Sequence, residues 1–139
     1  MKLVVDTNVF VSALISDSAT RRLLRSVDEG LVAPEMLQYE LERHDELVRK
    51  TSGLTRTELD VLVRGLLEHV ELLPAEALDP YRDPAANAMG DVDPDDVIFL
   101  ATALAVGGAI WSDDLHFREQ NLVPVVATRD VMDEVDSGE

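Results

Sequence analysis

The sequence predicts an α/β fold built around a mostly parallel β-sheet. Two short apolar runs, Lys2-Leu3-Val4-Val5 and Ala109-Ile110-Trp111, are typical of buried strands, and each leads directly into polar residues. The segments between them carry apolar residues at three- and four-residue spacings, which indicates helices. Strands that alternate with helices favour a parallel sheet, whose ligands bind at the carboxyl ends of the strands.

Three further strands are predicted from short apolar runs. Leu31-Val32-Ala33 follows Gly30, residues 123–126 form a fourth run, and residues 70–73 form a fifth. Pro124 has no backbone N–H to donate to a neighbouring strand, so the run that contains it is expected at an edge of the sheet.

Helices are predicted from apolar periodicity and from the residues at their ends. A helix is expected directly after Asp6, and others extend from Ser18 to Glu29, Pro34 to Lys50, Thr57 to His69 and Pro94 to Val106. Pro34 and Pro94 suit the first turn of their helices, where the backbone N–H has no partner within the helix. Residues 74–93 are rich in Pro, Ala, Asp and Gly, which predicts a long mobile loop inside a single domain of residues 1–139.

The composition is strongly acidic, with a formal net charge of -16 over 139 residues. Ten of the twelve basic residues are arginines, and the only lysines are Lys2 and Lys50. A generic basic nucleic-acid binder does not have this balance. Depletion of lysine beside abundant aspartate favours a halophile-like acidic surface adapted to high salt over one that only maintains solubility.

Composition also limits the compartment and the chemistry. The chain contains no cysteine, which excludes disulfides, thiolate zinc sites and a cysteine nucleophile. Residues 1–5 are too short for a secretory signal, and no later apolar run reaches membrane-spanning length. We therefore expect a cytoplasmic protein without a membrane partner.

Two acidic residues in the first half of the chain stand out by their positions. Asp6 ends the first predicted strand, where it is either a helix N-cap or a site residue. Glu40 lies within the apolar stripe of the helix predicted over residues 34–50, whereas Glu42 and Glu46 lie on its opposite face. A carboxylate on the buried side needs a cation, a metal or donated hydrogen bonds, unless it reaches solvent at the edge of the stripe. His44 shares this stripe and is interpreted as a core residue.

Doubled acidic residues occur at two places in the second half. Asp95-Asp96 is expected in the first turn of a buried helix after an N-cap at Asp93, with Asp96 facing inward. An EF-hand starting at Asp91 is excluded because its required glycine and glutamate are missing. Asp113-Asp114 follows the strand at residues 109–111, so one of the pair can face the site while its neighbour faces away.

Carboxylates from four separate segments can therefore meet at one edge of the sheet. Such a repelling group, without a nearby lysine or paired histidine, is best stabilised by a hard cation such as Mg²⁺ or Mn²⁺. A site of this kind suits the hydrolysis of phosphodiesters. A receiver domain is disfavoured because it needs a lysine after a late strand, and a dinucleotide-binding fold because no Gly-x-Gly-x-x-Gly is present.

Four motifs together resemble the PIN-domain family over essentially the whole chain. They are Val4-Val5-Asp6-Thr7-Asn8-Val9, Ala33-Pro34-Glu35 through Glu40-Leu41, Asp96-Val97-Ile98-Phe99-Leu100-Ala101, and Ile110-Trp111-Ser112-Asp113-Asp114-Leu115-His116-Phe117. The resemblance implies a three-layer α/β/α sandwich. It also implies a metal-binding catalytic quartet of Asp6, Glu40, Asp96 and Asp114, supported by Asn8, Ser112, Asp95 and Asp113. Either doubled acid can shift this quartet by one residue.

The same resemblance implies an activity and partners. We expect a divalent-metal-dependent endoribonuclease with an RNA substrate, a homodimer, and service as the toxin of a VapBC-type pair with an antitoxin partner. The alternative is a catalytically weak PIN-like module that binds nucleic acid or protein, because a fold alone does not ensure chemistry. Three basic residues are spaced to share one helix face as candidate RNA contacts, or else as a solvated face paired with Asp28 and Glu29: Arg21, Arg22 and Arg25.

Overall fold

The computed structural model describes residues 1–16, 18–27, 30–89 and 94–137. Five strands occur in this part of the chain: β1 (Leu3–Val5), β2 (Leu31–Pro34), β3 (Val70–Leu73), β4 (Ala109–Trp111) and β5 (Val125–Val126). The helices are α1 (Thr7–Ile15), α2 (Ala19–Ser26), α3 (Met36–Arg43), α4 (Asp45–Ser52), α5 (Arg56–Leu67), α6 (Ala75–Met89), α7 (Pro94–Val106), η1 (Leu115–Glu119) and α8 (Thr128–Ser137).

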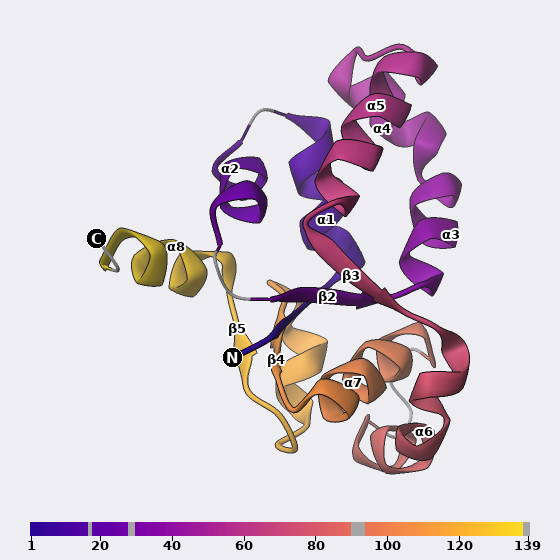
Figure 1. Ribbon diagram of the computed structural model, residues 1–139, viewed down its shortest axis with the longest axis vertical. Coiled ribbons are helices and arrows are strands. Elements are labelled where there is room, and N and C mark those ends of the chain that lie inside the picture. The colour runs from indigo at the N-terminus through magenta and orange to yellow at the C-terminus, as the bar shows by residue number, and fades with distance from the viewer. Residues whose placement is uncertain (17, 28–29, 90–93, 138–139) are drawn as a thin grey trace.

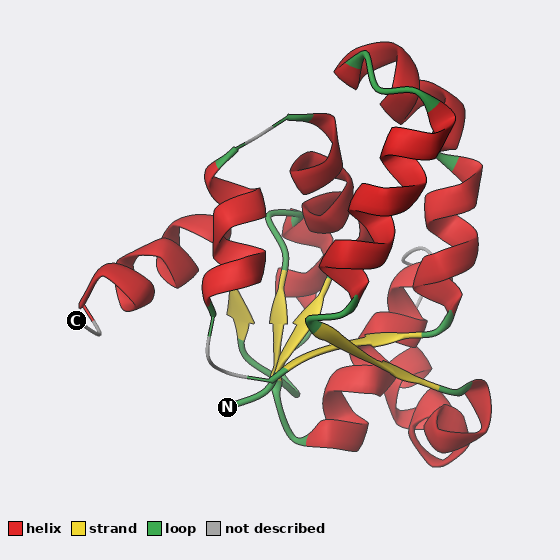
Figure 2. Ribbon diagram, turned by 45° about the horizontal axis from the view of Figure 1, so that its top comes forward, coloured by secondary structure: helices red, strands yellow, loops and turns green. Residues whose placement is uncertain are grey.

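The strands form one sheet in the order β3-β2-β1-β4-β5, and every neighbouring pair is parallel (Figure 2). Leu3 of β1 lies opposite Leu31 of β2 and Ala109 of β4, so the central strands start in register. Strand β5 lies at an edge, as Pro124 predicted. Because all strands run the same way, the residues that follow β1 and β4 emerge side by side at the carboxyl edge.

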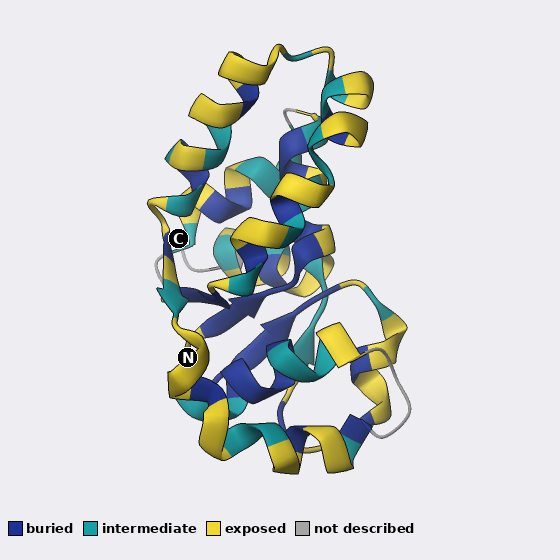
Figure 3. Ribbon diagram, turned by 90° about the vertical axis from the view of Figure 1, so that its right-hand side faces the viewer, coloured by how far each residue is buried: buried dark blue, intermediate teal, exposed yellow. Residues whose placement is uncertain are grey.

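Helices cover both faces of the sheet, which confirms the predicted three-layer sandwich. In Figure 1 α1 to α5 lie above the sheet, and α6 and α7 lie below it. Alternation along the strands feeds two cores: Leu3, Val5 and Trp111 pack on the first face, whereas Val4 and Ile110 pack on the second. Figure 3 shows the central strands as buried ribbons between largely exposed helices.

Gly108 allows β4 to approach β1 closely. A Cβ atom at this position would collide with the backbone carbonyl of Lys2. The Ala109 N–H donates to that same carbonyl at 3.0 Å, which begins the pairing of the two strands. A side chain at position 108 would therefore separate the two strands that carry Asp6 and Asp114 into the site.

The helix predicted from Pro34 to Lys50 is wrong in two respects. Pro34 is the last residue of β2, and the helical residues divide into α3 and α4 at His44. His44 takes φ -94° and ψ 0°, and its N–H donates to the carbonyls of Glu40 and Leu41. This bend turns Leu47 away from the core, so that its side chain is 57% exposed instead of continuing the apolar stripe.

Residues 75–89 form α6, which contradicts the predicted long loop. The helix places Leu78, Ala85 and Met89 in the second core. Its two internal prolines, Pro80 and Pro84, are exposed and lie away from that core. Burial of the apolar stripe against α7 therefore outweighs the local cost of the prolines, which sequence analysis overestimated.

Other elements were predicted with different ends: α2 ends at Ser26 before the predicted Glu29, and β5 covers only the last two residues of the run predicted over residues 123–126. Helix α2 begins after Ser18, whose side chain accepts the N–H of Arg21, and α5 begins with a capping box between Thr55 and Glu58. Helix α8 was not predicted, although its Val131 is buried in the first core. None of the helices in the described ranges is long and apolar enough to cross a membrane.

Candidate active site

Acidic side chains from four segments line one cavity of about 250 Å³ at the carboxyl edge of the sheet. Asp6 follows β1, Glu40 comes from α3, Asp96 from the first turn of α7, and Asp114 precedes η1. We call this space the acidic cavity. Its full lining is Asp6, Thr7, Asn8, Glu40, Arg43, His44, Asp95, Asp96, Phe99, Asp114 and His116. The tertiary structure thus brings together all four acids of the predicted quartet.

Asp6 is the most deeply buried of the four, with 5% of its surface exposed. Burial raises the pKa of its carboxyl, and the negative charges of Asp114 and Glu40 raise it further. Opposing this, a hydrogen bond from the Ser112 Oγ to the Asp6 Oδ2 at 2.8 Å lowers the pKa. A hydrogen bond from the backbone of Thr7 lowers this pKa as well, but the Asp6 side chain accepts no capping bond from the later N–H groups of the first turn of α1, so the N-cap interpretation fails for its carboxylate.

Ser112 links the ends of β1 and β4. Its hydroxyl donates to Asp6 and accepts the backbone N–H of Asp114 at 3.0 Å. The Asp114 Oδ1 in turn accepts the backbone N–H of His116 at 2.9 Å. This chain of bonds holds three acidic-cavity residues at set positions. The supporting role predicted for Ser112 is consistent with this arrangement.

Glu40 presents an unsatisfied acceptor inside the protein. Its Oε1 atom is buried and has no hydrogen-bond partner among the described residues, and the Thr7 Oγ1 is in the same condition. A buried carboxylate oxygen without a donor is costly, so such atoms usually have a partner. The alternative interpretation of Glu40, a side chain that reaches solvent at the edge of the apolar stripe, does not account for this buried oxygen.

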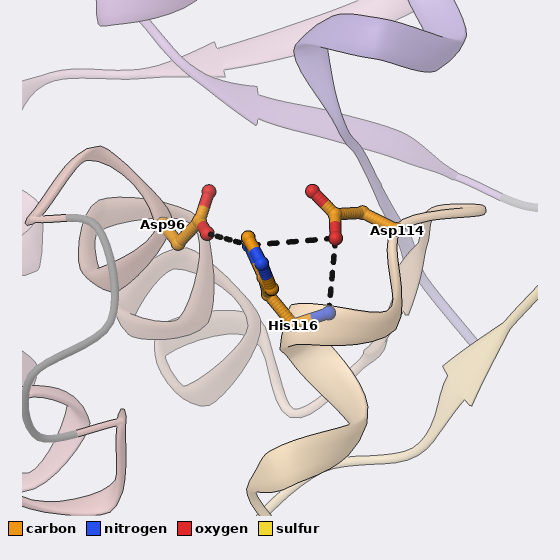
Figure 4. Close-up of side chains that lie close together, drawn as sticks. All are labelled: Asp96, Asp114 and His116. Carbon is orange, nitrogen blue, oxygen red and sulfur yellow. Dashed lines mark hydrogen bonds and ion pairs between the residues drawn. The ribbon is translucent and has the colours of Figure 1, made fainter.

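Asp96 and Asp114 face each other across the imidazole of His116 (Figure 4). The His116 Nδ1 lies 3.6 Å from the Asp96 Oδ2 and 3.5 Å from the Asp114 Oδ1. One donor atom from each of these three side chains lies within 4.8 Å of the others, a spacing at which they could hold one metal ion. His116 belongs to the PIN-like motif at residues 110–117, but sequence analysis assigned it no role, because a lone histidine has no recognisable ligand spacing.

The structure separates the members of each doubled acid. The Asp113 carboxylate turns away from the quartet and accepts both the backbone N–H and the hydroxyl of Thr128, at 2.8 and 2.7 Å. It lines a separate hollow beside Asn8 and Asp114. Asp95 is exposed at the rim of the acidic cavity, whereas the Asp96 side chain is 16% exposed and faces inward. Asp91 and Asp93 lie outside the described residues.

The basic residues near the cavity differ from those predicted. Arg43 and His44 line it, although sequence analysis gave no role to the first and placed the second in the core. Arg21 donates from Nε to the Ala13 carbonyl at 2.7 Å and from Nη2 to the Leu14 carbonyl at 3.3 Å, so it caps the end of α1. Arg22 and Arg25 are exposed on α2. Neither these two nor Arg21 is among the residues that line the acidic cavity.

The donor set fits a divalent cation. Four carboxylates converge, one of their oxygens is buried without a donor, and burial together with neighbouring charge raises the pKa of Asp6. A cation would relieve each of these costs at once, because it supplies the missing partner and offsets the repulsion. Among the described residues, Asp96, Asp114 and His116 offer donor atoms close enough together for one ion, and Asp6 and Glu40 line the same cavity.

Fold and cavity together define an α/β protein with an acidic centre at the carboxyl ends of a parallel sheet. The model of the PIN domain family matches residues 4–134, and the chain therefore belongs to that family. The fold is similar to a solved structure, VapBC2 from Rickettsia felis bound to a DNA fragment from their promoter. The TM-score is 0.72, the identity is 12%, and the match covers 91% of this chain and 98% of that one. No curated protein sequence matches the chain.

Proposed function

We propose that this protein is a divalent-metal-dependent endoribonuclease that uses Mg²⁺ or Mn²⁺. The observation that carries the proposal is the convergence of four carboxylates in one cavity, with the Glu40 Oε1 buried and unpartnered among the described residues. Membership of the PIN domain family supports a nuclease activity. RNA as the substrate, and the assignment of catalytic roles to Asp6, Glu40, Asp96 and Asp114, are parts of the proposal.

The residues of the chain divide the work between binding the cation and orienting the substrate. A bound Mg²⁺ or Mn²⁺ would acidify water and offset the charge of the phosphodiester. Ser112 holds the Asp6 carboxylate toward the cavity, and Asp114 is held by the Ser112 hydroxyl and the His116 backbone. Asn8 lies exposed beside Asp114, where its amide can orient water or a ribose hydroxyl. Arg43, exposed at the rim, can bind a flanking phosphate.

We further propose that the protein acts as the toxin of a VapBC-type pair, works as a homodimer and is restrained by an antitoxin. Similarity of fold to the VapBC2 structure from Rickettsia felis supports the toxin role. Expression of the chain alone should then slow growth of a host cell. Asp96→Asn should abolish this effect if cleavage causes it, whereas equal growth inhibition by wild type and Asp96→Asn would contradict the toxin role.

Two glutamates on α3 provide a matched test of the nuclease activity. Purified wild type, Glu40→Gln and Glu42→Gln are compared on single-stranded and structured RNA at one high ionic strength. Glu40 lines the acidic cavity, and Glu42 is exposed outside it. We expect cleavage in Mg²⁺ or Mn²⁺, loss of cleavage in chelator and in Glu40→Gln, and wild-type cleavage in Glu42→Gln. Ca²⁺ should raise the melting temperature without comparable turnover.

The outcomes separate the proposal from its alternative. Full activity in chelator, or wild-type activity of Glu40→Gln, would show that this cavity is not the catalytic site. Metal-induced stabilisation without cleavage of any RNA would instead favour the catalytically weak binding module. Equal metal stabilisation of wild type and Glu40→Gln would remove Glu40 from the metal site.

A further inference from the structure

We propose that His116 is a nitrogen ligand of the catalytic cation and that it makes the site prefer Mn²⁺ and Co²⁺ over Mg²⁺. This inference rests on the proposed function, because it concerns the same cation. It adds a nitrogen donor to the proposed carboxylate ligands and changes the chemical character of the site. The argument starts from the position of the Nδ1 atom between two acids that come from different elements.

The Nδ1 atom of His116 is close to both carboxylates without forming a good hydrogen bond to either. Its distances of 3.5 and 3.6 Å to Asp114 and Asp96 exceed the usual 2.7–3.2 Å range of N–H···O bonds. Donor atoms on opposite sides of one metal ion lie about 4 to 4.5 Å apart, and adjacent donors lie closer. The three side chains offer donor atoms within 4.8 Å of one another, which is close to this spacing.

The backbone around His116 sets the imidazole in this place. The Asp114 carboxylate accepts the His116 N–H, which fixes the start of η1, and Ser112 anchors Asp114 from the other side. Phe117, the next residue, is fully buried in the second core and holds η1 against the sheet. The imidazole therefore extends from a supported turn over the rim of the acidic cavity, although the His116 side chain is 59% exposed.

A nitrogen ligand changes which ions the site favours. Carboxylates suit Mg²⁺, Ca²⁺ and Mn²⁺, whereas imidazole suits the transition metals, and affinities rise from Mn²⁺ to Co²⁺ along the divalent series. An all-carboxylate site discriminates less between Mg²⁺ and the transition ions. A site that contains His116 should bind the transition ions more tightly, since Mg²⁺ gains least from exchanging an oxygen ligand for a nitrogen.

The competing interpretation is that His116 substitutes for the cation. A protonated imidazole between Asp96 and Asp114 would form ion pairs with both and would leave when a metal binds. The two interpretations predict opposite effects of removing the imidazole. Loss of a ligand weakens the binding of Mn²⁺, whereas loss of a competitor leaves it unchanged or tightens it.

The chain has three histidines, so the variant that tests His116 can be compared with the same substitution at the other two. His116→Gln removes the proposed ligand, His44→Gln removes the other imidazole that lines the cavity, and His69→Gln alters an exposed histidine outside it. Mn²⁺, Co²⁺ and Mg²⁺ affinities are measured by calorimetry at pH 8, because imidazole binds metals only in its neutral form. Electron spin-echo spectroscopy of bound Mn²⁺ detects a directly coordinated ¹⁴N.

We expect wild type to show the ¹⁴N coupling and to bind Mn²⁺ and Co²⁺ more tightly than Mg²⁺. His116→Gln should lose the coupling and bind Mn²⁺ and Co²⁺ roughly tenfold or more weakly, with a smaller change for Mg²⁺. His44→Gln and His69→Gln should keep the coupling. A melting curve of each variant without metal shows that it remains folded.

Several results would overturn the inference while leaving the nuclease proposal intact. They are Mn²⁺ binding by wild type without ¹⁴N coupling, coupling that disappears in His44→Gln instead of His116→Gln, and unchanged or tighter Mn²⁺ binding by His116→Gln. Failure of wild type to bind any of the three ions is a different result, because it would contradict the metal site itself and with it the proposed function.

Discussion

Two polar networks begin at the end of β4, and they have opposite characters. In the first, Asp113 accepts two hydrogen bonds from Thr128, whose hydroxyl also accepts the Trp111 Nε1 N–H at 3.0 Å. Every contact in this network pairs a donor with an acceptor. In the second, Asp114 and Asp6 are held by Ser112 beside two further carboxylates in the acidic cavity.

The difference distinguishes a structural acid from a candidate functional one. The Asp113 network ties the start of α8 to the sheet and requires nothing from outside the protein. The acidic cavity contains a buried oxygen of Glu40 without a donor and an Asp6 whose pKa is raised by burial. Adjacent residues of the same type thus differ in whether the fold satisfies them, and unsatisfied groups cluster at functional sites.

The largest expected effect separates the two networks by activity. Asp6→Asn, Asp96→Asn and Asp114→Asn should each reduce metal-dependent RNA cleavage by more than about 100-fold, because a direct ligand should matter more than its supporting groups. Asp113→Asn should retain most of the activity. Initial rates at saturating Mn²⁺ test this comparison. A loss in Asp113→Asn as large as that in Asp114→Asn would erase the distinction.

The second prediction concerns stability, which should depend on Asp113 although activity does not. Asp113→Ala should lower the free energy of unfolding by about 1 kcal/mol, since it removes the acceptor for the first N–H of α8. Thr128→Val should cost a similar amount. The double variant should lose less than the sum of the two, because both substitutions remove the hydrogen bond from the Thr128 hydroxyl to the Asp113 carboxylate. Denaturant titrations measure all three, and full additivity would show that the contact contributes little.

The third prediction is a dependence of stability on pH that comes from Asp6. Its pKa is raised in the folded protein above its ordinary value of 3.8, so between these two pKa values the folded state binds more protons. Metal-free wild type should therefore lose stability as pH rises through this window. The effect is moderated because the Ser112 hydrogen bond partly offsets the burial cost.

Asp6→Asn provides the comparison, because asparagine carries no titrating charge. Without metal, this variant should gain stability relative to wild type as pH rises above 3.8, and the difference should level off above the folded-state pKa of Asp6. Chemical denaturation in chelator across pH 3.5 to 7 measures the difference. A difference that stays constant across this range would show that Asp6 does not carry the strain assigned to it.

The smallest expected effect concerns contact with RNA. Arg43→Ala should weaken RNA binding by a factor of a few and reduce the salt slope by about 1, because Arg43 lines the acidic cavity. Charge reversal at Arg22 tests the α2 surface in the same assay, and the exposed side chain should tolerate it. A drop in affinity and salt slope for Arg22→Glu alone would place the RNA on α2 instead of at the cavity rim.

Much of the fold follows from the order of the residues. Short apolar runs at β1 and β4, and apolar spacing in α5 and α7, predicted these elements, and the alternation of strands with helices predicted a mostly parallel sheet. The predictions were wrong where local propensity and burial disagree. Prolines disfavoured a helix over residues 75–89, yet Leu78 and Met89 pack in the second core and stabilise it. A bend at His44 likewise has no distinctive local signal.

The sequence by itself determined which acidic residues could be gathered. Asp6 and Asp114 follow parallel strands, whose carboxyl ends share one edge, and the spacing of Glu40 and Asp96 on helices pointed both inward. Only the tertiary structure decided how neighbouring polar groups divide between structure and site. Asp113 is taken by Thr128 and Arg21 by the end of α1, whereas Arg43 and His116 reach the cavity. The physical reason is that a hydrogen bond or ion pair depends on partners distant in sequence, which periodicity along one segment cannot show.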